Sequence, residues 1–239
     1  AFFAHLPPRC AGSALKPAFI AAGALRRFGY HGLFHEAACA HACRLHKSSH
    51  ARTVPRILSI CLDPQSEVAA VLRDRPVMIT SGVTPLEGLP GQTTCGELDP
   101  GIIITLSEKM KWGPERIDAI LTRESGLLGL TGERATLGEV LTSEHYEGSL
   151  GRDVMNYRLL LACGAGIAAI GGLSHIVFSG RYADIGEIIG PRLISRILMN
   201  RLAPSVEIQQ HCFQNSLERI IADNAMTVLM ALPVQETTE

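Results

Sequence analysis

The sequence predicts an α/β fold, in which helices flank a central sheet. Short segments rich in Val, Ile and Leu follow one another at residues 56–62, 68–73 and 76–80, as neighbouring strands do. The longer segments downstream space their apolar residues as helices do, and apolar strand patterns follow at 173–178 and 206–209. With 239 residues and 46% hydrophobic content, the chain can bury a core.

Ahead of the first strand, helices are expected at residues 17–24 and 35–50. The second is rich in alanine, and one of its faces carries His35, Cys39, Cys43, His46 and His50. Cys and His are zinc ligands, so His35, Cys39 and Cys43 form a candidate metal site. One straight helix rarely offers more than two ligands to one ion. The alternative is therefore a partly buried face that packs against the protein.

A turn-rich loop follows the third strand, because glycine and proline recur throughout residues 82–96. Asp99-Pro100 then predicts a helix start, since Asp99 can cap free amides and proline fits the first turn. A glycine-rich loop before a capped helix can present backbone amides to a phosphate, or it can be an ordinary connection. Likewise, Glu87 and Asp99 are either catalytic carboxylates or a polar loop residue and a helix cap.

The second half of the chain is predicted to be mostly helical. Helices are expected from Pro114, at 137–141, at 152–170 and over GPRLISRILMNRL, with GLLGLTG as a connector. The glycines of GAGIAAIG lie inside a helical pattern, which favours close helix–sheet packing over a dinucleotide site. Last strands are expected at 206–209 and 227–232.

Composition excludes several classes of protein. The net charge of −1 lacks the basic excess that is typical of nucleic-acid-binding proteins. The longest apolar run, Leu159 to Leu173, is too short to span a bilayer, and no secretory signal is visible. Seven cysteines without CxxC spacing favour reduced thiols and a cytoplasmic location. Because the chain begins with Ala, we expect a processed product or a fragment.

Three stretches, SGVTPLEGL, GELDPGIIITL and LTRESGLLGLTG, resemble in this order the acetate kinase family, which includes propionate and butyrate kinases. The resemblance can be followed from residue 1 to about residue 236. It implies a ribonuclease H-like fold of the actin, Hsp70 and sugar kinase type, with a mixed central sheet. Residues 1–50 would end the first lobe, and residues 51–239 would form the second, nucleotide-binding lobe without its last helix.

The resemblance also implies site residues. LRRFGYHGLFH resembles the family's Arg-Arg-Tyr-Gly-x-His-Gly-Thr-Ser-His, so His31 matches the histidine beside the transferring phosphoryl group. Ser179, Gly180 and Asp184 match a nucleotide-binding turn. Glu236 matches a glutamate associated with magnesium.

Other motifs depart from the family. The phosphate loop His-Leu-Gly-Asn-Gly-Ala-Ser reads CLDPQSE here, which puts Cys61 and Asp63 in place of a histidine and a glycine. Pro64 lacks an amide donor, and Asp63 and Glu67 add negative charge where a triphosphate would lie. Thr94 replaces an arginine that would stabilise charge on the transferring oxygens. Arg181, after Gly180, would either fill the adenosine space or meet a phosphate.

By resemblance, the function is phosphoryl transfer from ATP to a short-chain carboxylate with Mg²⁺, which gives an acyl phosphate and ADP. That chemistry requires both lobes, so we expect the isolated chain to be inactive. One alternative is a non-catalytic remnant that acts as a binding or interaction module. The other is the metal-binding helical face. The expected partners are a nucleotide, a carboxylate, and a second copy or complementing lobe; nucleic acid and membrane are not expected.

Overall fold

A five-stranded mixed sheet forms the centre of the structure, a computed structural model that describes residues 2–23, 25–48, 53–197 and 207–210. The strand order is β3-β2-β1-β4-β5. The strands are β1 (Arg56–Cys61), β2 (Glu67–Leu72), β3 (Arg75–Ile79), β4 (His175–Ser179) and β5 (Glu207–Gln210). The first three pair antiparallel, and β4 pairs parallel with both β1 and β5. The predicted strands agree within two residues, except 227–232, which lies outside the described residues.

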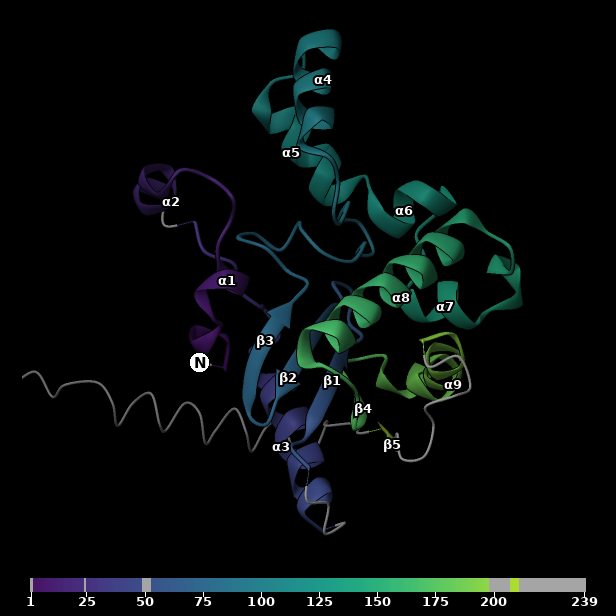
Figure 1. Cartoon of the computed structure of the whole chain (residues 1–239). Coiled ribbons are helices and arrows are strands. Elements are labelled where there is room, and N and C mark those ends of the chain that lie inside the picture. The colour runs from purple at the N-terminus through teal and green to yellow at the C-terminus, as the bar shows by residue number, and fades with distance from the viewer. Residues whose placement is uncertain (1, 24, 49–52, 198–206, 211–239) are drawn as a thin grey trace, which may run out of the picture.

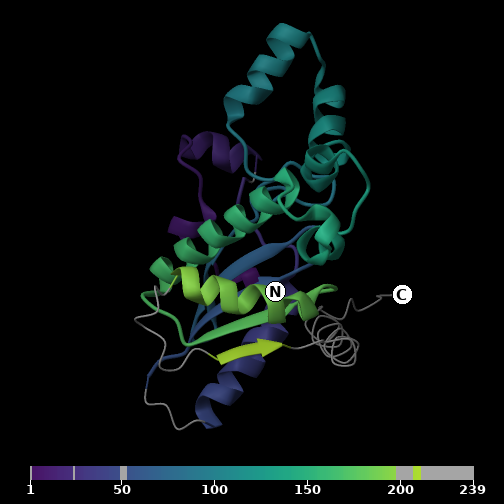
Figure 2. The same ribbon diagram turned by 90° about the vertical axis from the view of Figure 1, so that its right-hand side faces the viewer.

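Helices cover both faces of this sheet (Figure 2). On one face, α3 (Gly32–Ser48) packs on β1 and β4, together with η1 (Phe2–His5) and α1 (Pro8–Ala11). On the other face, α8 (Leu150–Ile170) crosses β2, β3 and β1. The alternation of buried strand residues explains the two layers: Ile57 and Val177 face the α3 side, whereas Leu58 and Phe178 face the α8 side.

The remaining helices lie around the α8 side and the top of the sheet (Figure 1). They are α2 (Pro17–Gly23), α4 (Pro100–Met110), α5 (Pro114–Arg123), α6 (Gly126–Thr131), α7 (Leu137–Thr142), η2 (Glu144–Tyr146), η3 (Ala183–Ile185) and α9 (Gly186–Ile197). Asp99 caps α4 as predicted, because its Oδ1 accepts a hydrogen bond from the Gly101 amide at 2.8 Å. Helices α4 and α5 stand away from the sheet.

The prediction of a connector at GLLGLTG is wrong. The segment forms α6, which buries Leu127 in the core and ends at Gly132 in the left-handed region. The division of the chain at residue 50 stays a prediction. Helix α3, which lies before that division, shares a core with β1, which lies after it, because Ala38 and Ala42 pack with Ile57.

Helix α8 is long and apolar enough to cross a membrane by length and composition, but this is weak evidence, since core helices pass the same test. Its side chains Met155, Leu159 and Cys163 are fully buried in the core. The packing therefore accounts for the apolar residues on one face of α8, whereas Leu150, Tyr157 and Leu161 of the same helix are exposed.

The glycines of GAGIAAIG have different roles, so the packing interpretation is correct only in part. A Cβ on Gly166 would lie 2.8 Å from Leu58 Cδ1 and 3.3 Å from Ala70 Cβ, which confirms close helix–sheet packing there. Gly164 faces open space, and Gly171 ends the helix with φ of +69°.

This difference gives a matched test within one helix. Gly166→Ala should lower the free energy of unfolding by about 1–3 kcal/mol through overpacking. Gly164→Ala should raise it by about 0.5–1 kcal/mol, because alanine favours the helix more than glycine does. Urea denaturation of both variants measures the difference. Equal effects would contradict the packing at Gly166.

Candidate functional site

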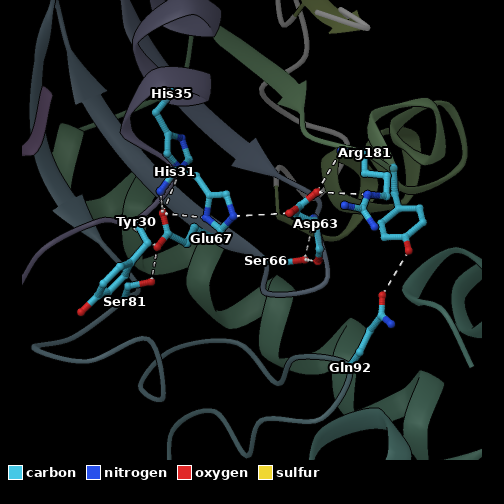
Figure 3. A network of polar contacts seen from close by, with 10 residues as sticks. Tyr30, His31, His35, Asp63, Ser66, Glu67, Ser81, Gln92 and Arg181 are labelled. Atoms are coloured by element: carbon cyan, nitrogen blue, oxygen red, sulfur yellow. Dashed lines mark hydrogen bonds and ion pairs between the residues drawn. The ribbon is translucent and has the colours of Figure 1, made fainter. Parts of the chain in front are cut away.

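The candidate site lies where the turn after β1 meets the start of α3, the start of β2 and the turn after β4 (Figure 3). His31 comes from the N-terminus of α3, Asp63 from the turn, Glu67 from β2 and Arg181 from the turn after β4. These residues come from three separate parts of the chain, around residues 31, 63–67 and 181, and their side chains point toward one another.

Glu67 is the most constrained of these residues, because its side chain is fully buried. Its carboxylate accepts hydrogen bonds from the amides of Tyr30 at 2.7 Å and His31 at 3.1 Å, and from Ser81 Oγ at 2.6 Å. Both amides lie just before α3, where a negative charge also favours the helix dipole. Burial by itself would raise the pKa of Glu67, but the neighbouring His31 and His35 outweigh it and hold the pKa far below its usual range. Glu67 is therefore a buried carboxylate anion.

His31 lies between two carboxylates. Its Nδ1 is 3.4 Å from Glu67 Oε2, and its Nε2 is 3.5 Å from Asp63 Oδ2. Burial lowers the pKa of His31, but the contacts with Asp63 and Glu67 outweigh it and raise the pKa to about 9. The ring is therefore an imidazolium cation at neutral pH, and both of its nitrogens face groups of the chain itself.

His35 lies one turn further along α3 and is fully buried. Its Nδ1 is hydrogen-bonded to Ser59 Oγ at 2.9 Å, and its Nε2 lies 3.5 Å from Glu67 Oε2. Burial lowers the pKa of His35 despite the nearby carboxylate, so the ring is neutral.

Of the two interpretations of this face of α3, the described residues favour packing against the sheet over a metal site. His35 and Cys39 are buried against the sheet, and Cys43 Sγ donates to the carbonyl of Arg73 at 3.0 Å. Within residues 2–23, 25–48, 53–197 and 207–210, no three His, Cys, Asp or Glu side chains come together as metal ligands. Residues of this face pack against the sheet as part of the core.

Asp63 joins the network to the turn after β4. Its Oδ1 accepts a hydrogen bond from the Arg181 amide at 3.2 Å, and Arg181 Nε lies 3.9 Å away. Burial tends to raise the pKa of Asp63, but His31 and Arg181 outweigh it and lower the pKa. Two carboxylates, one imidazolium and one guanidinium thus balance one another, and the balance needs no external ion.

The turn 62–66 is also fastened to the loop 88–96. The Gln92 amide donates to the carbonyl of Pro64 at 2.8 Å, and Gln65 Nε2 donates to the carbonyl of Leu89 at 3.2 Å. Thr94 Oγ1 contacts Gln65 Oε1, so Thr94 is held inside the network.

The amides of the glycine-rich loop bind the chain itself. The amides of Gly91, Cys95 and Glu97 donate to carbonyls of Thr94, Leu121 and Gly88 at 2.8–3.0 Å. These three amides are therefore not available to a phosphate, which favours the connecting-loop interpretation of this segment. Glu87 is an ion-pair partner of Arg27.

The residues that the resemblance assigns to nucleotide binding lie at the ends of β1 and β4 or shortly after them. Gly180 has φ of +89°, and a Cβ there would lie 2.5 Å from the Leu62 carbonyl oxygen, so only glycine fits. Ser179 Oγ is buried without a hydrogen-bond partner in the described structure, and Asp184 is exposed in η3. Cys61 is buried, and burial raises the pKa of its thiol well above the usual value. Glu236 lies outside the described residues.

The charge state of His31 is directly testable. In Asp63→Asn, the pKa of His31 should fall from about 9 toward its ordinary value of about 6.5, because one of the two carboxylates loses its charge. NMR titration of the imidazole C–H resonances measures this. The control is Asp74→Asn, in the exposed turn between β2 and β3. An unchanged His31 pKa in Asp63→Asn would contradict the pairing.

Comparison with known proteins gives a consistent set of relatives. The Acetokinase family profile matches residues 1–234. The acetate kinase of Trichormus variabilis is 34% identical over 166 residues, which cover 68% of this chain and 40% of that protein. The acetate kinase of Rhodopseudomonas palustris is 28% identical over 234 residues, covering 98% of this chain and 58% of the relative. The chain thus spans only part of the length of these curated relatives.

Solved structures show the same architecture. The acetate kinase of Porphyromonas gingivalis superposes with a TM-score of 0.78 and 24% identity, over 96% of this chain and 62% of that chain. A propionate kinase from Francisella tularensis gives a TM-score of 0.72 and 24% identity, over 84% and 51%. These likenesses confirm the expected fold, a mixed sheet flanked by helices of the actin, Hsp70 and sugar kinase type.

Proposed function

Since the chain belongs to the acetokinase family, we propose that it carries the nucleotide-side lobe of an ATP-dependent carboxylate kinase, with a phosphate site that its own Asp63 fills. In the reaction of such a kinase, a carboxylate oxygen forms a bond to the γ-phosphorus of ATP. The bond from that phosphorus to the bridging oxygen breaks, which gives an acyl phosphate and ADP. The candidate carboxylates are acetate and propionate, after the names of the relatives. In our proposal this chain alone does not carry out the transfer.

The observation that carries the proposal is the position of Asp63. Its carboxylate occupies the donors that an anionic ligand would need, the imidazolium of His31 and the amide of Arg181. A phosphate oxygen placed there would meet two carboxylates, Asp63 and the buried Glu67. A triphosphate does not fit these residues, because like charges at contact repel and the donors are already in use.

The nucleoside end of the site fits better than the phosphate end. Gly180 permits close approach of the backbone, and Ser179 Oγ is a buried polar atom without a partner in the described structure. Asp184 is an exposed carboxylate that could face a magnesium ion. Asp63 and Glu67 are both held by histidines and are poor candidates for metal ligands. Thus the chain would hold a nucleoside better than it holds Mg-ATP.

A second candidate function, an interaction module, is supported by the surface of α4. Ile102, Ile103, Ile104 and Met110 are all exposed on this helix, which stands away from the sheet. Exposed apolar groups in such density are typical of an association surface. A second copy or a complementing lobe would cover it.

Titration of the purified chain with Mg-ATP by calorimetry tests the proposal. We expect no binding heat up to millimolar nucleotide, and no acetyl phosphate when acetate and hydroxylamine are added to trap it. Micromolar binding that Asp184→Ala abolishes and Asp74→Ala leaves intact would overturn the filled phosphate site. Acetyl phosphate formation by the chain alone would overturn its inactivity.

A further inference from the structure

A hollow of about 550 Å³ lies between α8, β3, the N-terminal segment and the loop 87–97. It shares no lining residue with the network of Asp63, His31 and Arg181. Small-molecule sites occupy about 300–1,000 Å³ and are mostly apolar with a few convergent polar groups. The hollow has the size of such a site.

The floor of the hollow is apolar. Leu161 and three alanines of α8, Ala162, Ala165 and Ala169, line one side, spaced so that they share one face of the helix. Val77 and Met78 of β3 are also part of the lining. Because alanine side chains are short, this stretch of α8 leaves open space beside β3, in which an apolar chain can lie.

The rim of the hollow is charged, and its charges do not balance. Arg27 forms an ion pair with Glu87, and Arg158 forms one with Glu97 at 3.2 Å. Arg9 is exposed on the same rim and has no ion-pair partner among the residues that the structure describes. Three arginines thus face two glutamates. One positive charge remains, which a monoanion would neutralise.

We propose that this hollow binds an aliphatic monocarboxylate of medium chain length, with its chain along the alanines of α8 and its carboxylate at Arg9. The guanidinium fork of arginine matches a carboxylate in a bidentate geometry. The size of the hollow selects the chain length. A two-carbon acid would leave most of the hollow to water, whereas a chain of about eight to twelve carbons would displace much more of that water.

This ligand is not the phosphoryl acceptor, and the inference does not depend on the proposed function. No covalent step takes place in the hollow, which is a binding site only. A chain that binds no nucleotide can still bind the monocarboxylate, and a chain that forms acyl phosphate can still fail to bind it.

Calorimetric titration of the purified chain with decanoate, below its micelle concentration, tests the inference. Acetate serves as the control for size, and decyltrimethylammonium for the sign of the charge. We expect saturable binding of decanoate, at least tenfold weaker binding of the cation, and no heat from acetate in the same range. Arg9→Gln should raise the Kd for decanoate at least fivefold.

Two alanines of α8 give a matched pair of variants. Ala165→Phe fills the hollow and should raise the Kd for decanoate at least tenfold. Ala168→Phe, also exposed on α8 but outside the lining, should leave the Kd unchanged. Circular dichroism verifies that both variants are folded. The inference is wrong if decanoate fails to bind at 1 mM, if the cation binds equally well, or if the two phenylalanine variants behave alike.

Discussion

Glu67→Ala should lower the free energy of unfolding by about 3–5 kcal/mol, the largest stability effect that we expect for a single substitution in this chain. The carboxylate is buried and accepts three hydrogen bonds, from the amides of Tyr30 and His31 and from Ser81. Removal leaves these donors unsatisfied and leaves the His31 imidazolium without one of its two counter-charges. Since small domains have only about 5–15 kcal/mol of stability, the loss is a large fraction of the total.

Guanidinium chloride denaturation measures this effect, with Glu67→Gln as the graded variant. The glutamine keeps the size and the acceptor oxygen but not the charge, so its cost should be smaller than that of Glu67→Ala. Glu139→Ala, at an exposed carboxylate that closes the capping box of α7, should cost only about 0.5–2 kcal/mol. A loss below 1 kcal/mol for Glu67→Ala would show that water replaces the carboxylate, contrary to its burial here.

The same residues define the pH range of stability. The pKa of Glu67 is lowered in the folded state, so its contribution is present above about pH 4.3 and is lost as the pH falls below that value. The pKa of His31 is raised, so its contribution is complete below about pH 6.5 and is lost as the pH rises through about 9. The His31 shift corresponds to about 3 kcal/mol. In Glu67→Gln, both limbs of the stability–pH curve should flatten.

Rebuilding the turn after β1 should produce the largest change in ligand binding. The triple variant Asp63→Gly, Pro64→Asn, Gln65→Gly removes the internal carboxylate, restores an amide donor at 64 and releases Thr94 from its contact with Gln65. A like charge at contact costs about 1–4 kcal/mol, so removing it should strengthen the binding of Mg-ATP by roughly 5- to 1,000-fold. Calorimetry gives the Kd of the variant, and the absence of binding heat from the wild type up to millimolar Mg-ATP sets the lower limit of the wild-type Kd against which the gain is measured.

The control for this experiment carries a similar change in charge elsewhere. Asp74→Gly removes a carboxylate from the exposed turn between β2 and β3 and should leave nucleotide binding unchanged. The rebuilt variant should also lower the pKa of His31, because Asp63 no longer contacts it. If the His31 pKa falls but Mg-ATP still fails to bind, Asp63 is not what excludes the triphosphate, and our assignment of its role is wrong.

Local sequence patterns were sufficient to predict most of the elements. β-Branched and leucine-rich runs predict β1 to β3 within two residues, and Asp99-Pro100 predicts the start of α4. These predictions succeed because β1, β2 and β3 are joined by short turns into hairpins, and because a helix cap lies next to the helix that it caps. The failure at α6 has a tertiary cause, since the burial of Leu127 stabilises a helix that its glycines alone do not favour.

The sequence by itself therefore determined the fold, the family resemblance and the altered motifs, including the substitution of Asp63 in the phosphate loop. Only the tertiary structure decided what those residues do. It brings the Glu67 carboxylate within hydrogen-bonding distance of the amides of Tyr30 and His31, and it buries His35 and Cys39 of α3 against the sheet. It also brings Arg9, Arg27 and Arg158 to the rim of one hollow. The physical reason is that burial and charge pairing depend on residues far apart in the chain, which no local pattern brings together.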